Sequence, residues 1–189
     1  MGAPPLSLRF LQGQGGDLKE RFHLFPMRRA ADQIRGKLDR AEKHIQELTA
    51  ALLSFKNGEP YKLATKEDPK TRCLVYYITK ADDIPAAIPF IAGDALQNIR
   101  TALDHLAWQL VPVNERGPQT AFPIFDDASK YQTGKTQRIK GIPNAAMDLV
   151  DAAKPYKGGN ERLWRLHRLN NIDKHRLLIT VGAASNRSM

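Results

Sequence analysis

Residues 27–56, MRRAADQIRGKLDRAEKHIQELTAALLSFK, are the stretch that decides the fold. Their apolar side chains alternate steps of four and three residues, a spacing that predicts one apolar seam along a long helix. The seam consists of Ile34, Leu38, Ala41, Ile45, Leu48, Leu52 and Phe55. Asn57, Gly58 and Pro60 come next, and such residues typically end a helix.

A second long helix is predicted over residues 89–111, where apolar residues recur at helical spacing and form one broad face. Shorter helices are expected over residues 144–153 and 160–171, the latter capped by Asn160. The segments PVNERGPQT and TGKTQRIKGIP are expected to be loops. The predicted fold is therefore a mainly helical α+β bundle built on the helices over 27–56 and 89–111.

The β part of this fold is expected between the two long helices. The runs YKLAT and TRCLVYYIT flank the polar turn KEDPK, and the second run is rich in β-branched and aromatic residues. This pattern predicts a small antiparallel hairpin. The run HRLLITVG, residues 175–182, is also typical of a strand, and it would need a partner in the hairpin.

The length of 189 residues is sufficient for one domain with a sizeable core. Hydrophobic residues make up 42% of the chain and charged residues 26%, a balance typical of globular proteins. Residues 1–26 contain several glycines and prolines and are expected to be an irregular lead-in. We therefore expect one domain over residues 27–182 and a polar tail over 183–189.

Composition also restricts the classes of function. No apolar stretch reaches the roughly 18 residues that a bilayer span needs, so membrane insertion is not expected. The single cysteine, Cys73, can form neither an intramolecular disulfide nor a multi-cysteine metal site, which favours a reducing compartment and a cytoplasmic location. Its apolar neighbours suggest a buried thiol.

The charge distribution favours partners that carry phosphate groups. The formal net charge is +9, and from Lys154 to the end of the chain eight basic residues stand against two acidic ones. A basic surface attracts nucleic acid through long-range electrostatics and counterion release, although many basic proteins bind none.

Polar side chains form a line along the second long helix. Asp94, Asn98, Thr101 and His105 are spaced by four, three and four residues, and Asp104 lies beside them. A solvated helix face would explain such a line. A functional site would explain it too, because a carboxylate, an amide and an imidazole can orient one another, and histidine is suited to proton transfer near neutral pH.

A second polar cluster lies in the segment LHRLNNIDKHR. It consists of His167, Arg168, Asn171, Asp173, Lys174 and His175. The ordinary interpretation is a helix end, at which Asn and Asp stop the helix and Lys and His complement its dipole. The density of basic and polar groups also fits a binding surface.

The segment GDALQNIRTALDHLAWQL, in which four residues separate Arg100 from His105, resembles the signature of the HEPN superfamily. These are small helical-bundle proteins, often dimeric, and many are metal-independent ribonucleases of toxin, defence and RNA-processing systems. They commonly carry Asn, Asp or His directly after the arginine, where this chain has Thr101. Together with FPIFDD and LWRLHRLNNIDKHRLL, the segment is also similar to uncharacterised bacterial proteins.

The resemblance implies an RNA-binding protein and an endoribonuclease in which Arg100 and His105 are catalytic. His105 would transfer protons, and Arg100 would stabilise charge on the pentacoordinate phosphate. Five residues on a regular helix separate two side chains by about 140°. The arginine must therefore curl round the helix, or a homodimer must bring two pairs into one cleft.

Two alternatives remain open from the sequence. The first is a noncatalytic helical interaction module that binds protein or nucleic acid. The second is a metal-dependent hydrolase, whose candidate ligands are Asp94, His105, His167, Asp173 and His175, although no HxxxH or HExxH pair is present. The chain has no GxxxxGK[ST], GxSxG or GxGxxG motif, so neither a nucleotide nor any other cofactor is expected.

Overall fold

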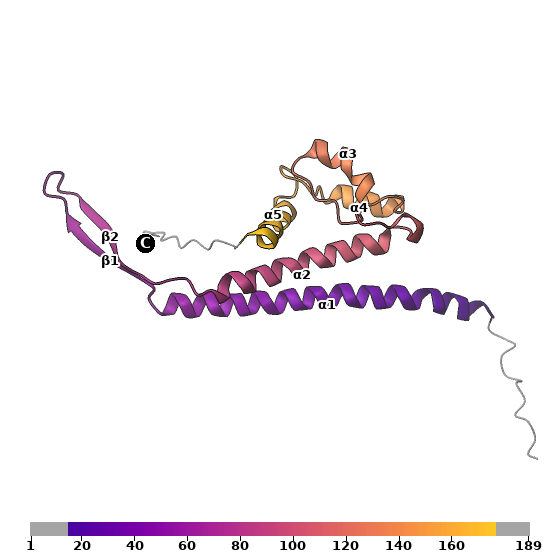
Figure 1. Cartoon of the computed structure of the whole chain (residues 1–189), viewed down its shortest axis with the longest axis horizontal. Coiled ribbons are helices and arrows are strands. Elements are labelled where there is room, and N and C mark those ends of the chain that lie inside the picture. The colour runs from indigo at the N-terminus through magenta and orange to yellow at the C-terminus, as the bar shows by residue number, and fades with distance from the viewer. Residues whose placement is uncertain (1–14, 177–189) are drawn as a thin grey trace, which may run out of the picture.

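A computed structural model describes the backbone of residues 15–176 and the side chains from Arg28 onward. Its elements, in chain order, are α1 (Gly15–Asn57), β1 (Tyr61–Glu67), β2 (Leu74–Ala81), α2 (Ala87–Leu110), the 3₁₀ turn η1 (Val113–Glu115), α3 (Ala128–Arg138), α4 (Asn144–Ala152) and α5 (Glu161–His175). Figure 1 shows α1 and α2 side by side, the hairpin beyond one end of this pair, and α3 to α5 on the opposite side of α2 from α1. The prediction of a mainly helical α+β fold with a small antiparallel sheet is confirmed.

The pairing of α1 with α2 uses four of the seven residues of the predicted apolar seam. The side chains of Ile34, Ala41, Leu48 and Phe55 are buried or half-buried where α1 packs on α2. The other three, Leu38, Ile45 and Leu52, remain 45–47% exposed. The half-buried stripe instead includes Ala30, Lys37, His44 and Ala51. The helix is thus rotated, and one row of the seam faces away from α2.

The start of α1 differs from the prediction. The helix begins at Gly15 rather than at residue 27, so residues 15–26 are not an irregular lead-in. The run DLKERFHLF contains mostly good helix formers, and the helix continues through Pro26 although a proline removes one backbone hydrogen bond. Residues 1–14 and 177–189 lie outside the described residues, so the proposed boundaries of a domain over 27–182 and a tail over 183–189 stay predictions.

The hairpin forms where the sequence predicts it. β1 and β2 pair antiparallel, with Tyr61 opposite Ala81 at the base and Glu67 opposite Leu74 at the tip. Cys73, just before β2, is exposed, so the expectation of a buried thiol was wrong. The reason is that within the described structure this hairpin packs on no second layer. The strand predicted over 175–182 falls almost entirely outside the described residues.

The core of the C-terminal half lies against the last turns of α2. Its buried members are Ala107, Val111, Phe122, Ile124, Tyr131, Ile139, Ile142 and Val150. Part of the segment predicted as a loop is helix α3, whose N-terminus is capped by the Asp127 carboxylate accepting a hydrogen bond from the Lys130 amide. Gly134 serves close packing rather than a turn, because a Cβ there would lie 2.6 Å from the Phe125 ring. The predicted helices over 144–153 and 160–171 are observed as α4 and α5.

Among the described residues, no helix combines the length and the apolar character that crossing a bilayer requires.

Candidate functional site

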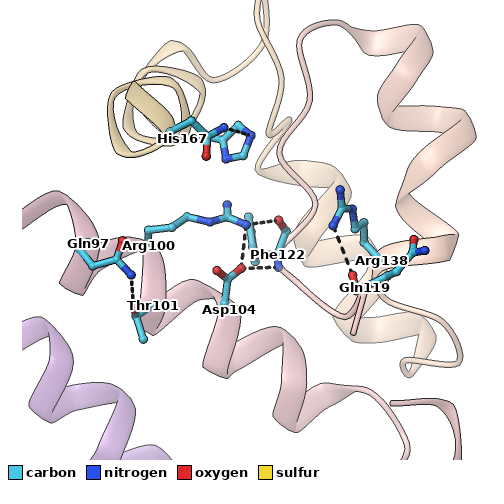
Figure 2. A network of polar contacts seen from close by, with 9 residues as sticks. Gln97, Arg100, Thr101, Asp104, Gln119, Phe122, Arg138 and His167 are labelled. Carbon is cyan, nitrogen blue, oxygen red and sulfur yellow. Dashed lines mark hydrogen bonds and ion pairs between the residues drawn. The ribbon is translucent and has the colours of Figure 1, made fainter. Parts of the chain in front are cut away.

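Arg100 lies on the side of α2 that faces the C-terminal half, and its guanidinium is held by protein groups. The side chain is 6% exposed. Its Nη2 donates hydrogen bonds to Asp104 Oδ1 at 2.7 Å and to the Phe122 carbonyl at 3.0 Å (Figure 2). The Phe122 amide in turn donates to the same Asp104 oxygen at 3.0 Å. Arg100 and Asp104 therefore fix the segment that leads into FPIF onto α2.

His167 on α5 approaches this group from the other side. Figure 2 shows its ring above the Arg100 side chain, while Asp104 lies below. Burial lowers the pKa of His167, and the neighbouring Arg100 guanidinium lowers it further. Burial also lowers the pKa of Arg100, although Asp104 opposes this effect. A cation on the imidazole is thus disfavoured, which fits a neutral histidine beside a charged arginine.

Several polar atoms at the α2–α5 contact have no protein hydrogen-bond partner among the described residues. They are Arg100 Nη1, His167 Nδ1, and both amide atoms of Asn170, a side chain that is 1% exposed. The contact is close, because a Cβ on Gly93 would lie 2.6 Å from an Asp173 carboxylate oxygen. α5 is therefore held against α2 by a tight but incompletely paired polar layer.

His105 lies on the other side of α2, in a groove between α1 and α2. The groove has a volume of about 480 Å³ and is lined by Gln33, Gly36, Lys37, Arg40, Asn98 and His105. His105 is exposed. Lys37 Nζ donates to Asn98 Oδ1 at 3.4 Å, which ties the two helices together at the groove. Of the lining side chains that the structure describes, two are cationic and none is acidic, so the groove suits an anion.

The predicted catalytic pair is therefore divided in this chain. Arg100 bonds to Asp104 and Phe122 towards the C-terminal half, whereas His105 lines the groove with α1. This division follows from the angle of about 140° between positions five residues apart on a helix. Within one chain, the two side chains do not form one site.

The remaining residues of the polar line on α2 also separate. Asn98 joins His105 in the groove, and its amide donates to the Asp94 carbonyl at 2.8 Å. Thr101 accepts a hydrogen bond from Gln97 at 3.2 Å, and Asp94 is exposed. Asp104 lies with Arg100. For Asp94 and Thr101 the arrangement is that of a solvated helix face.

The second predicted cluster does not form one site either. His167 and Asp173 face α2, and Asn171 contacts the His167 ring through its amide at 3.1 Å. The other side chains of the cluster, Arg168, Lys174 and His175, are exposed. Lys174 and His175 occupy the last turn of α5, where cations complement the helix dipole. The helix-end interpretation therefore explains these two residues, although α5 runs four residues beyond the predicted end.

The candidate metal ligands Asp94, His105, His167, Asp173 and His175 would have to lie close together to hold a metal ion. Among residues whose side chains are described, no three or more His, Cys, Asp or Glu are grouped so that they could hold a metal ion. His105 in the groove and His167 at the α2–α5 contact lie on different sides of α2.

The sequence-based prediction missed the α1 side of the groove. Gln33, Gly36, Lys37 and Arg40 recur at the spacing of one helix face, so a polar stripe was visible in the sequence. The partner of this stripe was not visible, because the apolar seam gave no indication of which of its rows would face α2. The actual rotation of α1 places Lys37 next to α2 instead.

Comparison of this chain with protein-family models, with curated proteins and with solved structures finds no match.

Proposed function

We propose that the protein is a HEPN-like RNA-binding protein and that RNA binds in the groove between α1 and α2. The observation that carries this proposal is the set of side chains in the groove, where Lys37 and Arg40 lie with His105 and none of the described lining residues is a carboxylate. Ammonium and guanidinium groups bind phosphate oxygens directly. The net charge of +9 draws a polyanion towards the protein.

The same groups could support RNA cleavage without a metal. The ribose 2′-hydroxyl attacks phosphorus, a base takes its proton, and the 5′-oxygen leaves with a proton from an acid, giving a 2′,3′-cyclic phosphate. His105 would serve the proton transfers. Lys37 or Arg40 would stabilise the pentacoordinate phosphate, a role that the resemblance assigned to Arg100. We propose this endoribonuclease activity, of toxin, defence or RNA-processing type, as the finer form of the function.

A noncatalytic interaction module is the second candidate, and the position of Arg100 favours it. Arg100 is buried, and its guanidinium donates hydrogen bonds to Asp104 and to the Phe122 carbonyl. Its role is therefore structural, and it does not face the groove. A chain that keeps the signature arginine for its fold can bind RNA or protein in the groove without cleaving it. The two candidates share the groove and differ in chemistry.

RNA binding is tested with purified full chain and a fluorescent single-stranded RNA. The Lys37→Ala/Arg40→Ala variant is expected to bind about tenfold more weakly at low salt and to flatten the plot of log K against log salt by about 0.7 per cation removed. The matched control is Arg35→Ala/Lys43→Ala, which removes two exposed cations of α1 outside the groove. Equal losses in both variants would contradict a site in the groove.

Cleavage is tested with a mixed RNA pool in excess chelator, with product ends read for cyclic phosphate. His105→Ala and Lys37→Ala/Arg40→Ala are expected to abolish the products that end in a cyclic phosphate. The helix content of both variants, measured by circular dichroism, is expected to stay unchanged. Arg100→Ala is compared at a temperature where it is folded. Absence of cleavage by the wild type, together with groove-dependent binding, would select the noncatalytic module.

We also propose a homodimer that works in the cytoplasm. The exposed row Leu38, Ile45 and Leu52 repeats every seven residues, as in a helix that packs on a second helix. Two copies of α1 running antiparallel would place Ile45 on the two-fold axis and Leu38 opposite Leu52 of the partner subunit. The row is thus complementary to itself.

The dimer is tested by light scattering of the eluted protein. Ile45→Asp is expected to convert a species of about twice the chain mass of 21.2 kDa into monomer. The control is Gln46→Asp, which places the same charge on the adjacent exposed position. A monomeric wild type at micromolar concentration would contradict the proposal.

A further inference from the structure

The exposed side of α5 carries a row of three arginines. Arg162, Arg165 and Arg168 are spaced by three residues, so each is the neighbour of the next on the helix surface. All three are exposed, whereas Leu166 and Asn170 on the same helix are buried. The row is about 9 Å long along the helix axis. This arginine row therefore presents three guanidinium groups to solvent.

Carboxylates neutralise little of this charge. Within the described structure, Arg165 is the one member of the row with a carboxylate oxygen within 4.0 Å, and that distance, to Glu161, is 3.9 Å. The same Glu161 carboxylate accepts a hydrogen bond from the Gly158 amide at 2.9 Å. Asp126, on the segment beside α5, lies 3.6 Å from Lys130. The arginine row thus keeps most of its positive charge unpaired.

The stability of α5 does not explain the arginine row. Like charges one turn apart repel each other and weaken a helix. Arg162 also lies in the first turn of α5, where the helix dipole disfavours a cation. A solvated helix face typically mixes both signs, as α1 does with Asp39, Lys43 and Glu47. Since the row lowers the stability of its helix, a binding function explains it better.

The composition of this surface selects the class of partner. Guanidinium groups bind phosphate oxygens through paired hydrogen bonds, and most protein contacts to nucleic acid are made with its backbone. A helix that lies on a membrane needs bulky apolar side chains beside its cations. On the described α5, Leu169, at 41%, is the only exposed large apolar side chain. A protein partner also requires an apolar or aromatic centre in the interface. The arginine row therefore fits a phosphate backbone best.

We propose that the arginine row of α5 is a second nucleic-acid surface, which binds the phosphate backbone of RNA. One strand of a duplex carries a phosphate per roughly 3.4 Å of axis, so a row of about 9 Å spans about three phosphates. α5 lies on the opposite side of α2 from α1, so the row is separate from the groove (Figure 1). The row does not depend on RNA binding in the groove.

The arginine row is tested in the full chain with a short fluorescent single-stranded RNA, whose anisotropy reports binding. The background is Lys37→Ala/Arg40→Ala, which disables the groove. Adding Arg162→Gln/Arg165→Gln/Arg168→Gln removes three charges and keeps long, helix-forming side chains. The remaining affinity at low salt is expected to fall about tenfold, and the slope of log K against log salt to flatten by about 0.7 per cation removed.

The matched control removes three exposed cations of α1 that do not line the groove. In the same background, Arg35→Gln/Lys43→Gln/Lys56→Gln changes the net charge by the same amount. It is expected to weaken binding by no more than about twofold. Both sets of substitutions should leave the midpoint of thermal unfolding unchanged, because they replace exposed side chains. Equal losses of affinity in the two variants would show that net charge alone attracts RNA, and would overturn the proposal.

The arginine row and the groove fail separately in this design. If the groove binds no RNA, Lys37→Ala/Arg40→Ala alone leaves affinity unchanged, and the three glutamines introduced into the wild-type background should then cause the tenfold loss. Binding that is absent from the groove-disabled background, or that survives there without the arginine row, would overturn the row and leave the groove as the RNA site.

An anionic membrane is the alternative that a second probe addresses. Vesicles of equimolar phosphatidylcholine and phosphatidylserine are sedimented with the wild type and with the variant that lacks the arginine row. The proposal expects no sedimentation that depends on the row. Row-dependent sedimentation without row-dependent RNA binding would overturn the proposal and assign this face of α5 to a lipid surface.

Discussion

The two sides of α2 carry polar groups with opposite environments. Towards α5 and FPIF, Arg100 is buried, bonded to Asp104 and the Phe122 carbonyl, and close to a histidine whose pKa is lowered. Towards α1, His105 is exposed in an open groove with two cations. The first side has the character of a structural network, and the second that of a binding surface.

This difference shows that a short motif on a helix can be divided by the fold. The spacing of Arg100 and His105 resembles a catalytic signature, but burial assigns them different tasks. The arginine fixes an irregular segment to the helix, because its guanidinium can bond a carboxylate and a carbonyl together. The histidine remains available to a ligand.

Arg100→Ala is expected to destabilise the protein by about 3 kcal/mol, because it leaves the Asp104 carboxylate and the Phe122 carbonyl without their partner. The measurement is the free energy of unfolding from a denaturant titration. Arg162→Ala is the control, since Arg162 is exposed and also precedes a histidine by five residues, and its change should stay within about 0.5 kcal/mol. Unchanged stability in Arg100→Ala would contradict a structural role of Arg100 and would favour a functional one.

A pair of glycine substitutions tests the packing on each side of α2. Gly93→Ala places a Cβ 2.6 Å from the Asp173 carboxylate and is expected to cost about 1 kcal/mol, since α5 must shift. Gly36→Ala on α1 meets no atom within 4 Å and should stabilise the helix by up to about 1 kcal/mol. Thermal unfolding measures both changes.

Rescue identifies the cause of the Gly93→Ala loss. Asp173→Ala in the same chain should restore most of the stability if the carboxylate is the obstacle. A Gly93→Ala variant as stable as the wild type would show that the two helices are not closely packed at this point.

The sequence predicted where the helices and strands lie better than it predicted which elements pack against one another. The two long helices and the hairpin follow from local periodicity and turn residues, and these features are visible along the chain. α3 was missed because Gly134 was interpreted as a loop residue, whereas it serves contact with Phe125. Asp127 was a candidate N-cap that could have located this helix, because a carboxylate at that position accepts a hydrogen bond from a backbone amide of the first turn.

The candidate site was harder to predict, for a physical reason. Periodicity locates the apolar stripe of a helix but not the partner that each row of the stripe faces. On α1, the row that contains Lys37 and the row that contains Leu38 are offset by one residue. A small rotation of the helix therefore decides which of the two rows faces α2. The bond between Arg100 and the Phe122 carbonyl joins positions 22 residues apart, and no local pattern encodes it.

His105→Ala should leave the free energy of unfolding within about 0.5 kcal/mol of the wild type, because the side chain is exposed and no buried network depends on it. RNA affinity is expected to fall about threefold through loss of one polar contact in the groove. Fluorescence anisotropy measures the affinity, and Gln109→Ala on an exposed position of the same helix is the control. If His105→Ala strongly lowered stability but did not change RNA affinity, His105 would be a structural residue and the groove side of α2 would not be the binding surface.

The smallest expected effect concerns the pH dependence of stability at the α5 side. His167 faces Arg100, Asp104, Asp126 and Arg138, and burial with the nearby arginines lowers its pKa in the folded protein. In the unfolded chain, histidine titrates near pH 6.5, so the unfolded state takes up a proton first as the pH falls. Stability should therefore fall from about pH 6.5 down to the lowered native pKa and then level off.

His167→Gln removes this titration and keeps a polar side chain at the position. The difference in unfolding free energy between wild type and variant should therefore be constant above pH 7 and should shift in favour of the variant as the pH falls below about 6.5. The Asp151 carboxylate, whose pKa is lowered by Lys135 and Tyr131, changes stability at more acidic pH and contributes equally to both proteins. A pH-independent difference would mean that His167 is as free to take up a proton in the folded protein as in the unfolded chain. The α5 side of α2 would then be as open to solvent as the groove, and the contrast between the two sides would rest on Arg100 alone.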